Sequence, residues 1–241
     1  MNTSSNGYVL SFAVGLCVVI SSALSLTASA LKDTQLAAEE FDRQKNVMLA
    51  AGLIKPGDTQ ARTALEQLYQ QRVEERVLEL ASGETGKVTP DAFKKLRDKE
   101  RAPYRLIAVT KDAQGKDDAW VLPISGPGLW SILFGFLALE SDGMRVRGLT
   151  FYKHGETPGL GGECENPEWT AKWVGKTIVD DAGKLVSITV KKGKVDASIS
   201  REKEHMVDGL SGATITSNGI TNFVHGDLEA YLPLLRRIWK K

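Results

Sequence analysis

The stretch YRLIAVTKDAQGKDDAWVLPI, residues 104–124, decides the fold of this chain. Apolar runs at its two ends flank the polar turn Asp-Ala-Gln-Gly at 112–115, which is the pattern of a β-hairpin. A second pair of apolar runs, 133–139 and 144–152, flanks a Ser-Asp-Gly turn. Two successive hairpins favour an antiparallel sheet over regular β-α-β winding.

Helices are expected around this sheet. The spacing of apolar residues predicts helices over 36–53 and 61–80, and Thr-Pro-Asp at 89–91 opens another short helix. Apolar and polar residues alternate again over 186–190, as in a strand. The expected fold class is therefore α+β, a mixed, largely antiparallel sheet domain with peripheral helices.

The N-terminal segment is apolar enough to cross a membrane. Residues 1–31 contain no charged side chain, and 8–31 are long enough for a single transmembrane helix. Ala-Ser-Ala at 28–30 resembles a signal-peptidase site, but the missing basic region and the length of the run favour a retained anchor. We therefore expect an anchor over 1–31, juxtamembrane and peripheral helices over 32–102, and a further domain over 103–241.

Overall charge and motif content exclude several functions. The chain has 241 residues, with 31 basic against 30 acidic, and no basic stripe interleaved with aromatics, so nucleic acid is not an expected partner. The cysteines and histidines have no metal-ligand spacing, so no metal site is expected. Neither a dinucleotide fingerprint, a P-loop nor a Gly-x-Ser-x-Gly elbow is present.

Residues 208–214, Asp-Gly-Leu-Ser-Gly-Ala-Thr, are hard to explain by packing alone. They precede an apolar stripe over 220–235 with helical spacing, which places the hydroxyl groups at a helix N-terminus. Such a terminus binds anions, and Gly212 and Ala213 carry no large side chain to exclude a phosphate. The alternative is that these residues only cap the helix and form its turn.

Two glycine-rich loops are further candidates for a binding site. Residues 126–130 read Gly-Pro-Gly-Leu-Trp, and residues 154–162 read His-Gly-Glu-Thr-Pro-Gly-Leu-Gly-Gly. Glycine permits close approach of the backbone to a ligand, although both loops are also explained as structural turns. Carboxylates in a loop of this polarity are expected to be solvated.

The run 208–214 resembles the pattern Asp-x-x-(Ser/Thr)-Gly-Ala-Thr of proteins in which FMN is attached by a phosphoester to the last threonine. The resemblance implies attachment at Thr214 by a separate flavin transferase that cleaves FAD with the help of magnesium. Asp208 would serve chemistry or recognition. Thr216 and Ser217 are competing hydroxyls that we interpret as capping or phosphate-binding groups.

In the order of its anchor, its loops and its threonine motif, the chain resembles the NqrC family of the sodium-translocating NADH:quinone oxidoreductases. The related G-type protein of the Rnf electron-transport complex shares the second loop and the threonine motif, and is the nearest alternative. The resemblance implies a covalent FMN-binding domain over 103–241, with the isoalloxazine near both loops. The implied site comprises Thr214, Ser211, Gly212, Ala213, Asp208, Thr216, Glu156, Thr157, Leu160 and Trp130.

The same resemblance implies a single-pass protein of the bacterial inner membrane with its C-terminal domain in the periplasm. It would carry electrons between other subunits of a complex that passes them from NADH to quinone and exports sodium. Charge alone points the other way, because Lys32 follows the span and no basic residue precedes it. Alone, the chain is not expected to oxidise NADH or to pump sodium. An alternative of another class is a membrane-tethered assembly or binding module without flavin.

Overall fold

The first helix, α1 (Asn6–Ala50), runs for 45 residues and contains the apolar segment expected to span a membrane. The computed structural model describes residues 6–240, so residues 1–5 of the predicted anchor lie outside the described part. One window of 18 residues in α1 has a mean hydropathy of 2.3 and none of it is buried. The helix is therefore long and apolar enough to cross a bilayer, and Ala-Ser-Ala at 28–30 lies inside it.

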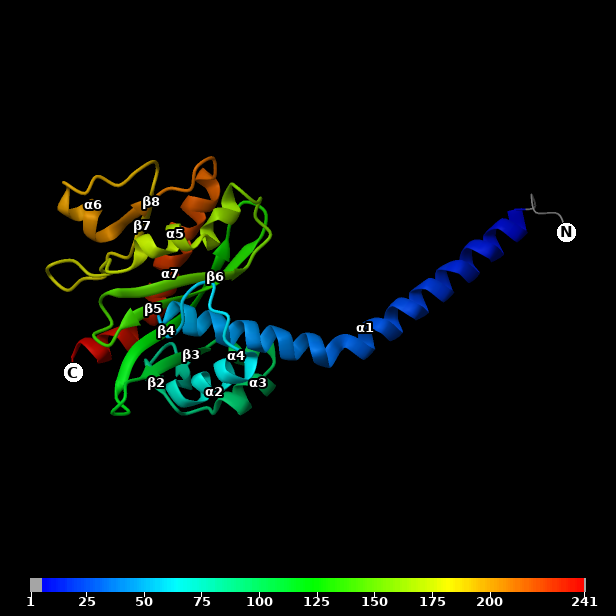
Figure 1. Ribbon diagram of the computed structural model, residues 1–241, viewed down its shortest axis with the longest axis horizontal. Helices are drawn as coiled ribbons and strands as arrows, with labels where there is room; N and C mark the ends of the chain where they lie inside the picture. Colours follow the sequence, from blue (N-terminus) through cyan, green and yellow to red (C-terminus); the bar gives the residue numbers. More distant parts are fainter. Residues whose placement is uncertain (1–5, 241) are drawn as a thin grey trace. The chain divides into compact units, whose positions relative to one another are not determined.

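The chain divides into two units, residues 1–42 and residues 43–241. The second unit holds a six-stranded sheet in the order β2-β1-β3-β4-β5-β6, in which all neighbours are antiparallel (Figure 1). The strands are β1 (Val73–Glu79), β2 (Glu84–Thr85), β3 (Tyr104–Lys111), β4 (Asp117–Pro127), β5 (Ile132–Glu140) and β6 (Val146–Lys153). Both predicted hairpins are confirmed. The carboxylate of Asp112 shapes the first turn by accepting hydrogen bonds at 2.8 Å from the backbone amides of Gln114 and Lys116.

The helix predicted over 61–80 is wrong in its second half. Helix α2 (Arg62–Arg72) ends where β1 begins, and β1 pairs along its whole length with β3, from Val73 opposite Thr110 to Glu79 opposite Tyr104. The apolar spacing fitted a helix, but pairing with a distant strand overrides local preference. The sheet therefore includes strands from before residue 103, where the third domain was expected to begin.

Short helices and a second, smaller sheet complete this unit. Helix α3 (Pro90–Lys95) begins as predicted, with the Thr89 hydroxyl accepting a hydrogen bond from the amide of Ala92 at 3.3 Å. The strand expected within 186–190 is β7 (Thr189–Lys191), which pairs in parallel with β8 (Met206–Asp208), so the strand content is mixed, as predicted. The other short elements are α4 (Asp98–Arg101), η1 (Gly161–Glu165), α5 (Pro167–Thr170), η2 (Ala171–Trp173) and α6 (Ser200–His205).

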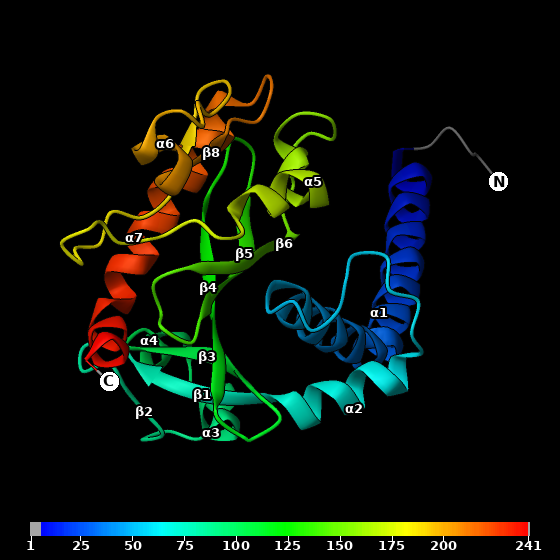
Figure 2. The same ribbon diagram turned by 60° about the vertical axis from the view of Figure 1, so that its left-hand side comes forward.

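The last helix, α7 (Thr214–Trp239), packs along the sheet and buries one apolar face. β3 pairs with β4 only as far as Val121, and α7 satisfies backbone groups farther along β4. The Tyr231 hydroxyl donates to the Pro123 carbonyl at 2.6 Å, and the Asp227 carboxylate accepts from the Ser125 amide at 2.8 Å. In Figure 2 the N-terminal end of α7 lies near α6 and β8, and its C-terminal end lies near β1, away from them.

Candidate functional site

The threonine of the Ser-Gly-Ala-Thr run is the first residue of α7, and its side chain is exposed. The N-cap residue is Ala213, which makes no side-chain cap, and the Ser217 amide donates to the Ala213 carbonyl at 2.9 Å. Among the described residues, the backbone amides of residues 214–216 meet no hydrogen-bond acceptor. The hydroxyls of the motif therefore do not cap α7, and its first turn keeps the unpaired amides and partial positive charge that favour an anion.

The four hydroxyl groups around this helix start have different surroundings. Ser211 and Thr214 are exposed, whereas Thr216 and Ser217 are 1% and 5% exposed. The Thr216 hydroxyl donates to Glu156 Oε2 at 2.7 Å, and Ser217 Oγ accepts from the Leu210 amide at 3.2 Å. Only the first two hydroxyls are therefore open to a ligand.

Glu156 joins the two glycine-rich loops to α7. Its side chain is 5% exposed, so the expectation of a solvated carboxylate is wrong at this position. Oε1 accepts from the amides of Trp130 at 2.9 Å and Ser131 at 3.2 Å. Oε2 accepts from the Leu129 amide at 3.2 Å as well as from the Thr216 hydroxyl. One buried carboxylate thus ties three segments together.

The ionised form of this carboxylate is the stable one. Burial opposes ionisation, but the hydrogen bonds from Thr216 and from the three backbone amides outweigh it and hold the pKa of Glu156 below its usual range. A Cβ on Gly161 would lie 2.7 Å from Oε2, and a Cβ on Gly128 would lie 2.7 Å from Oε1. Glycine is therefore required at both positions to leave room for the carboxylate.

Other glycines of the region allow α7 and the first loop to pack closely. A Cβ on Gly219 would lie 3.3 Å from the carbonyl carbon of Pro127, and a Cβ on Gly126 would overlap the Phe223 ring. Gly126 and Pro127 belong to β4, so the loop itself begins at Gly128. These glycines permit close approach between protein segments, where the sequence had indicated approach to a ligand or a turn.

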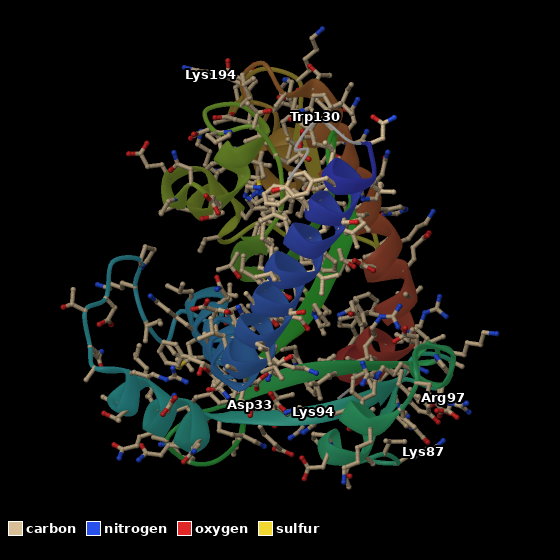
Figure 3. The ribbon with its side chains drawn as sticks, turned by 90° about the vertical axis from the view of Figure 1, so that its right-hand side faces the viewer. Asp33, Lys87, Lys94, Arg97, Trp130 and Lys194 are labelled. Carbon is tan, nitrogen blue, oxygen red and sulfur yellow. The ribbon has the colours of Figure 1, made fainter. Side chains whose placement is uncertain are left out.

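Large apolar side chains near the helix start are exposed to solvent. Leu129 and Trp130 of the first loop are 47% and 71% exposed, Leu160 of the second loop is 43% exposed, and Ile215 is 57% exposed. Figure 3 shows Trp130 at the same end of this unit as Lys194. Leu160 lies against the motif, because a Cβ on Gly212 would be 2.8 Å from Leu160 Cδ2. A rim of apolar groups therefore borders the open hydroxyls.

Asp208 is fully engaged in structural contacts. Its Oδ1 accepts from the Val195 amide at 2.7 Å and its Oδ2 pairs with Lys172 Nζ at 2.7 Å, while its carbonyl accepts from Trp169 Nε1 at 2.8 Å. Burial opposes ionisation, yet the Lys172 and Val195 contacts hold the pKa of Asp208 below its usual range. These contacts fix the end of β8 immediately before the motif.

The structure brings most of the predicted site residues together at this end of the fold. It also adds residues that sequence reasoning missed, namely Leu129, Ile215, Trp169 and Lys172. Thr157 is exposed and contributes its carbonyl, which accepts from the Gly162 amide at 2.9 Å. Exposed apolar residues beside Trp130 and Thr214 were a usable signal for Leu129 and Ile215, but no local pattern links Lys172 to Asp208.

Comparison with known proteins first defines the class. The FMN-binding domain family matches residues 128–229, a span that begins at the first loop and includes the start of α7. The C subunit of the Na(+)-translocating NADH-quinone reductase from Yersinia pestis is 39% identical, covering 92% of this chain and 88% of that protein. The same protein from Pseudomonas aeruginosa is 37% identical, with 98% of both chains covered.

Solved structures agree with these relatives. NqrC of Shewanella oneidensis superposes with a TM-score of 0.70 at 26% identity, covering 85% of this chain and 100% of that chain. The chain therefore belongs to the NqrC family, the C subunits of the Na(+)-translocating NADH-quinone reductases. The predicted resemblance to this family and the predicted fold class are confirmed.

Proposed function

We propose that this chain is the electron-carrying FMN subunit of a sodium-translocating NADH:quinone reductase, with FMN joined through its phosphate to Thr214. The observation that carries the proposal is the exposed hydroxyl of Thr214 at an uncapped helix start, within a region that matches the FMN-binding domain family. It is not catalytically complete alone and works with the other subunits of the complex.

The residues present fit the phosphate of FMN. The unpaired amides of residues 214–216 would donate to phosphate oxygens, and the Ser211 hydroxyl is open beside them. In the attachment step a flavin transferase breaks the pyrophosphate bond of FAD, the Thr214 oxygen bonds to the FMN phosphorus, and AMP leaves with the hydroxyl proton released. Because Asp208 is paired with Lys172, we assign it to the structure of the motif.

The ring would meet the apolar rim of Leu129, Trp130, Leu160 and Ile215. Bound FMN supplies one- and two-electron transfer, and the protein positions the ring and limits its contact with water. Thr157, which is exposed in the second loop, is proposed to border the ring as well. Glu156 was expected beside the ring, but its carboxylate oxygens are both occupied by protein donors, so we do not assign it a direct contact with the ring.

The apolar part of α1 would anchor the protein in the bacterial inner membrane as a single span, with residues 43–241 in the periplasm. In the complex, electrons from NADH would pass through this chain towards quinone, and sodium export would depend on subunits with charged pathways through the membrane. A covalent link would retain the cofactor on the outer face, where no FMN is available for exchange.

In-gel flavin fluorescence tests the proposal. The full chain is produced together with a flavin transferase, denatured and separated, alongside Thr214→Ala and Ser211→Ala. We expect fluorescence in the wild type and in Ser211→Ala, whose hydroxyl is equally exposed, and none in Thr214→Ala. A wild-type band without fluorescence, or a fluorescent Thr214→Ala band, would contradict attachment at Thr214.

A further inference from the structure

We propose that Glu156 is a positioning residue, whose carboxylate holds the loop 128–131 and the first turn of α7 in the arrangement that receives FMN. This inference rests on the proposed function, because it concerns the same site. It differs from the role that the sequence implied, in which Glu156 borders the ring directly. The residue acts through the groups that it orients.

The hydrogen bonds of Glu156 require a carboxylate. Four donors converge on its two oxygens, two on each, at distances between 2.7 and 3.2 Å. Three of them are consecutive backbone amides, from Leu129 to Ser131, which form an anion-binding concavity. A glutamine has only one oxygen, and its NH₂ group would face two donors. Substitution by glutamine therefore leaves at least one buried donor unpaired while the size of the side chain is kept.

The same carboxylate sets where the attachment residue lies. Thr216 is two residues after Thr214, so the two differ by about 3 Å along the axis of α7. Holding the Thr216 hydroxyl therefore fixes the position of Thr214 relative to the Trp130 loop. It also uses the Thr216 hydroxyl as a buried donor, which leaves Thr214 as the open threonine of this turn.

Glycines around the carboxylate support this role over that of a general acid or base. Gly128 and Gly161 are closed against its oxygens, and neither oxygen has a vacant approach for a reacting group. The charge nonetheless lies beside the proposed flavin site. Removing it would stabilise the electron-rich reduced flavin, so the midpoint potential would become more positive.

A test in the absence of flavin uses the full chain in detergent, in a Thr214→Ala background. Hydrogen exchange of the Leu129, Trp130 and Ser131 amides is compared between Glu156→Gln and Glu168→Gln, a control that removes an exposed carboxylate on α5. We expect exchange in Glu156→Gln to be at least about tenfold faster than in the control. Equal exchange in the two variants would overturn the proposal. If Glu156→Gln does not fold, Thr216→Val, which removes a single donor, is expected to give a smaller increase in exchange, and no increase would overturn the proposal.

A second test uses the wild-type attachment residue and a flavin transferase. Glu156→Gln is expected to lower the yield of FMN on Thr214 and to shift the midpoint potential of the attached flavin to a more positive value, with Glu168→Gln unchanged. Faster amide exchange with unchanged yield and potential would overturn the link to the flavin. If the wild type takes no FMN, the proposed function fails, and the exchange experiment alone decides whether Glu156 organises the loop.

Discussion

Replacing Gly219 with alanine tests how tightly α7 packs on the end of β4. A Cβ at this position would come closer than 3.0 Å to the carbonyl oxygen of Pro127 and lie 3.5 Å from Gly128 Cα. The obstacle is backbone, so a rotamer change cannot relieve it, and α7 or the loop must move. Overpacking of this kind costs about 1–3 kcal/mol, which opposes a gain of about 1 kcal/mol from the better helix propensity of alanine.

Gly226 provides the matched control on the same helix. A Cβ there meets nothing within 4 Å, so Gly226→Ala should gain about 1 kcal/mol without penalty. The two variants share the propensity gain, and Gly219→Ala should therefore be less stable than Gly226→Ala by about 1–3 kcal/mol.

Urea unfolding of the full chain in detergent, followed by tryptophan fluorescence, measures this difference. In the flavin-bound protein Gly219→Ala should also weaken the site, because the loop that moves leads into Leu129 and Trp130. A Gly219→Ala protein as stable as Gly226→Ala would refute the close packing of α7 against Pro127.

Three further predictions concern buried polar groups. Thr216→Val should lower the free energy of unfolding by about 1.5–3 kcal/mol, because a charged acceptor loses a donor, whereas Thr214→Val at the exposed position should change it by less than about 0.5 kcal/mol in urea unfolding; equal effects would contradict the geometry. Since the pKa of Glu156 is depressed in the folded state, its contribution to stability is present above about pH 4.3 and is lost as the pH falls through the folded value. Acid titration of unfolding should show this loss in the wild type and not in Glu156→Gln. Burial raises the pKa of Asp227, although the Ser125 amide opposes the shift, so the wild type should gain stability as the pH falls through the folded value, with the gain complete below about pH 3.9. Asp227→Asn should be more stable than the wild type at pH 7, and unfolding midpoints at pH 7 and 5 that move in parallel for both proteins would count against this.

Local signals were sufficient for the hairpins and for the helix after the threonine motif. The turn at Asp112 is organised by its own side chain, so its sequence carries the structure. β1 was missed because Val73 and Val77 have a spacing that suits a helix, and only pairing with β3 makes this segment a strand. Such pairing joins residues far apart in the chain, which periodicity cannot report.

The candidate site shows the same division. The motif and its exposed threonine were found from sequence, because a small, hydroxyl-rich turn before an amphipathic helix has a physical meaning at short range. The burial of Glu156 was not found, since it depends on three amides 25 to 27 residues away and on the Thr216 hydroxyl 60 residues away. The role of the glycines was likewise fixed by what they touch in the folded protein.

Peptide mass spectrometry of the full chain produced with a flavin transferase tests the central claim most directly. The peptide containing residues 211–217 would be isolated and fragmented to locate any added mass. We expect the mass of FMN less one water on Thr214, with Ser211, Thr216 and Ser217 unmodified. An unmodified peptide, or FMN located on another of these hydroxyls, would contradict the account.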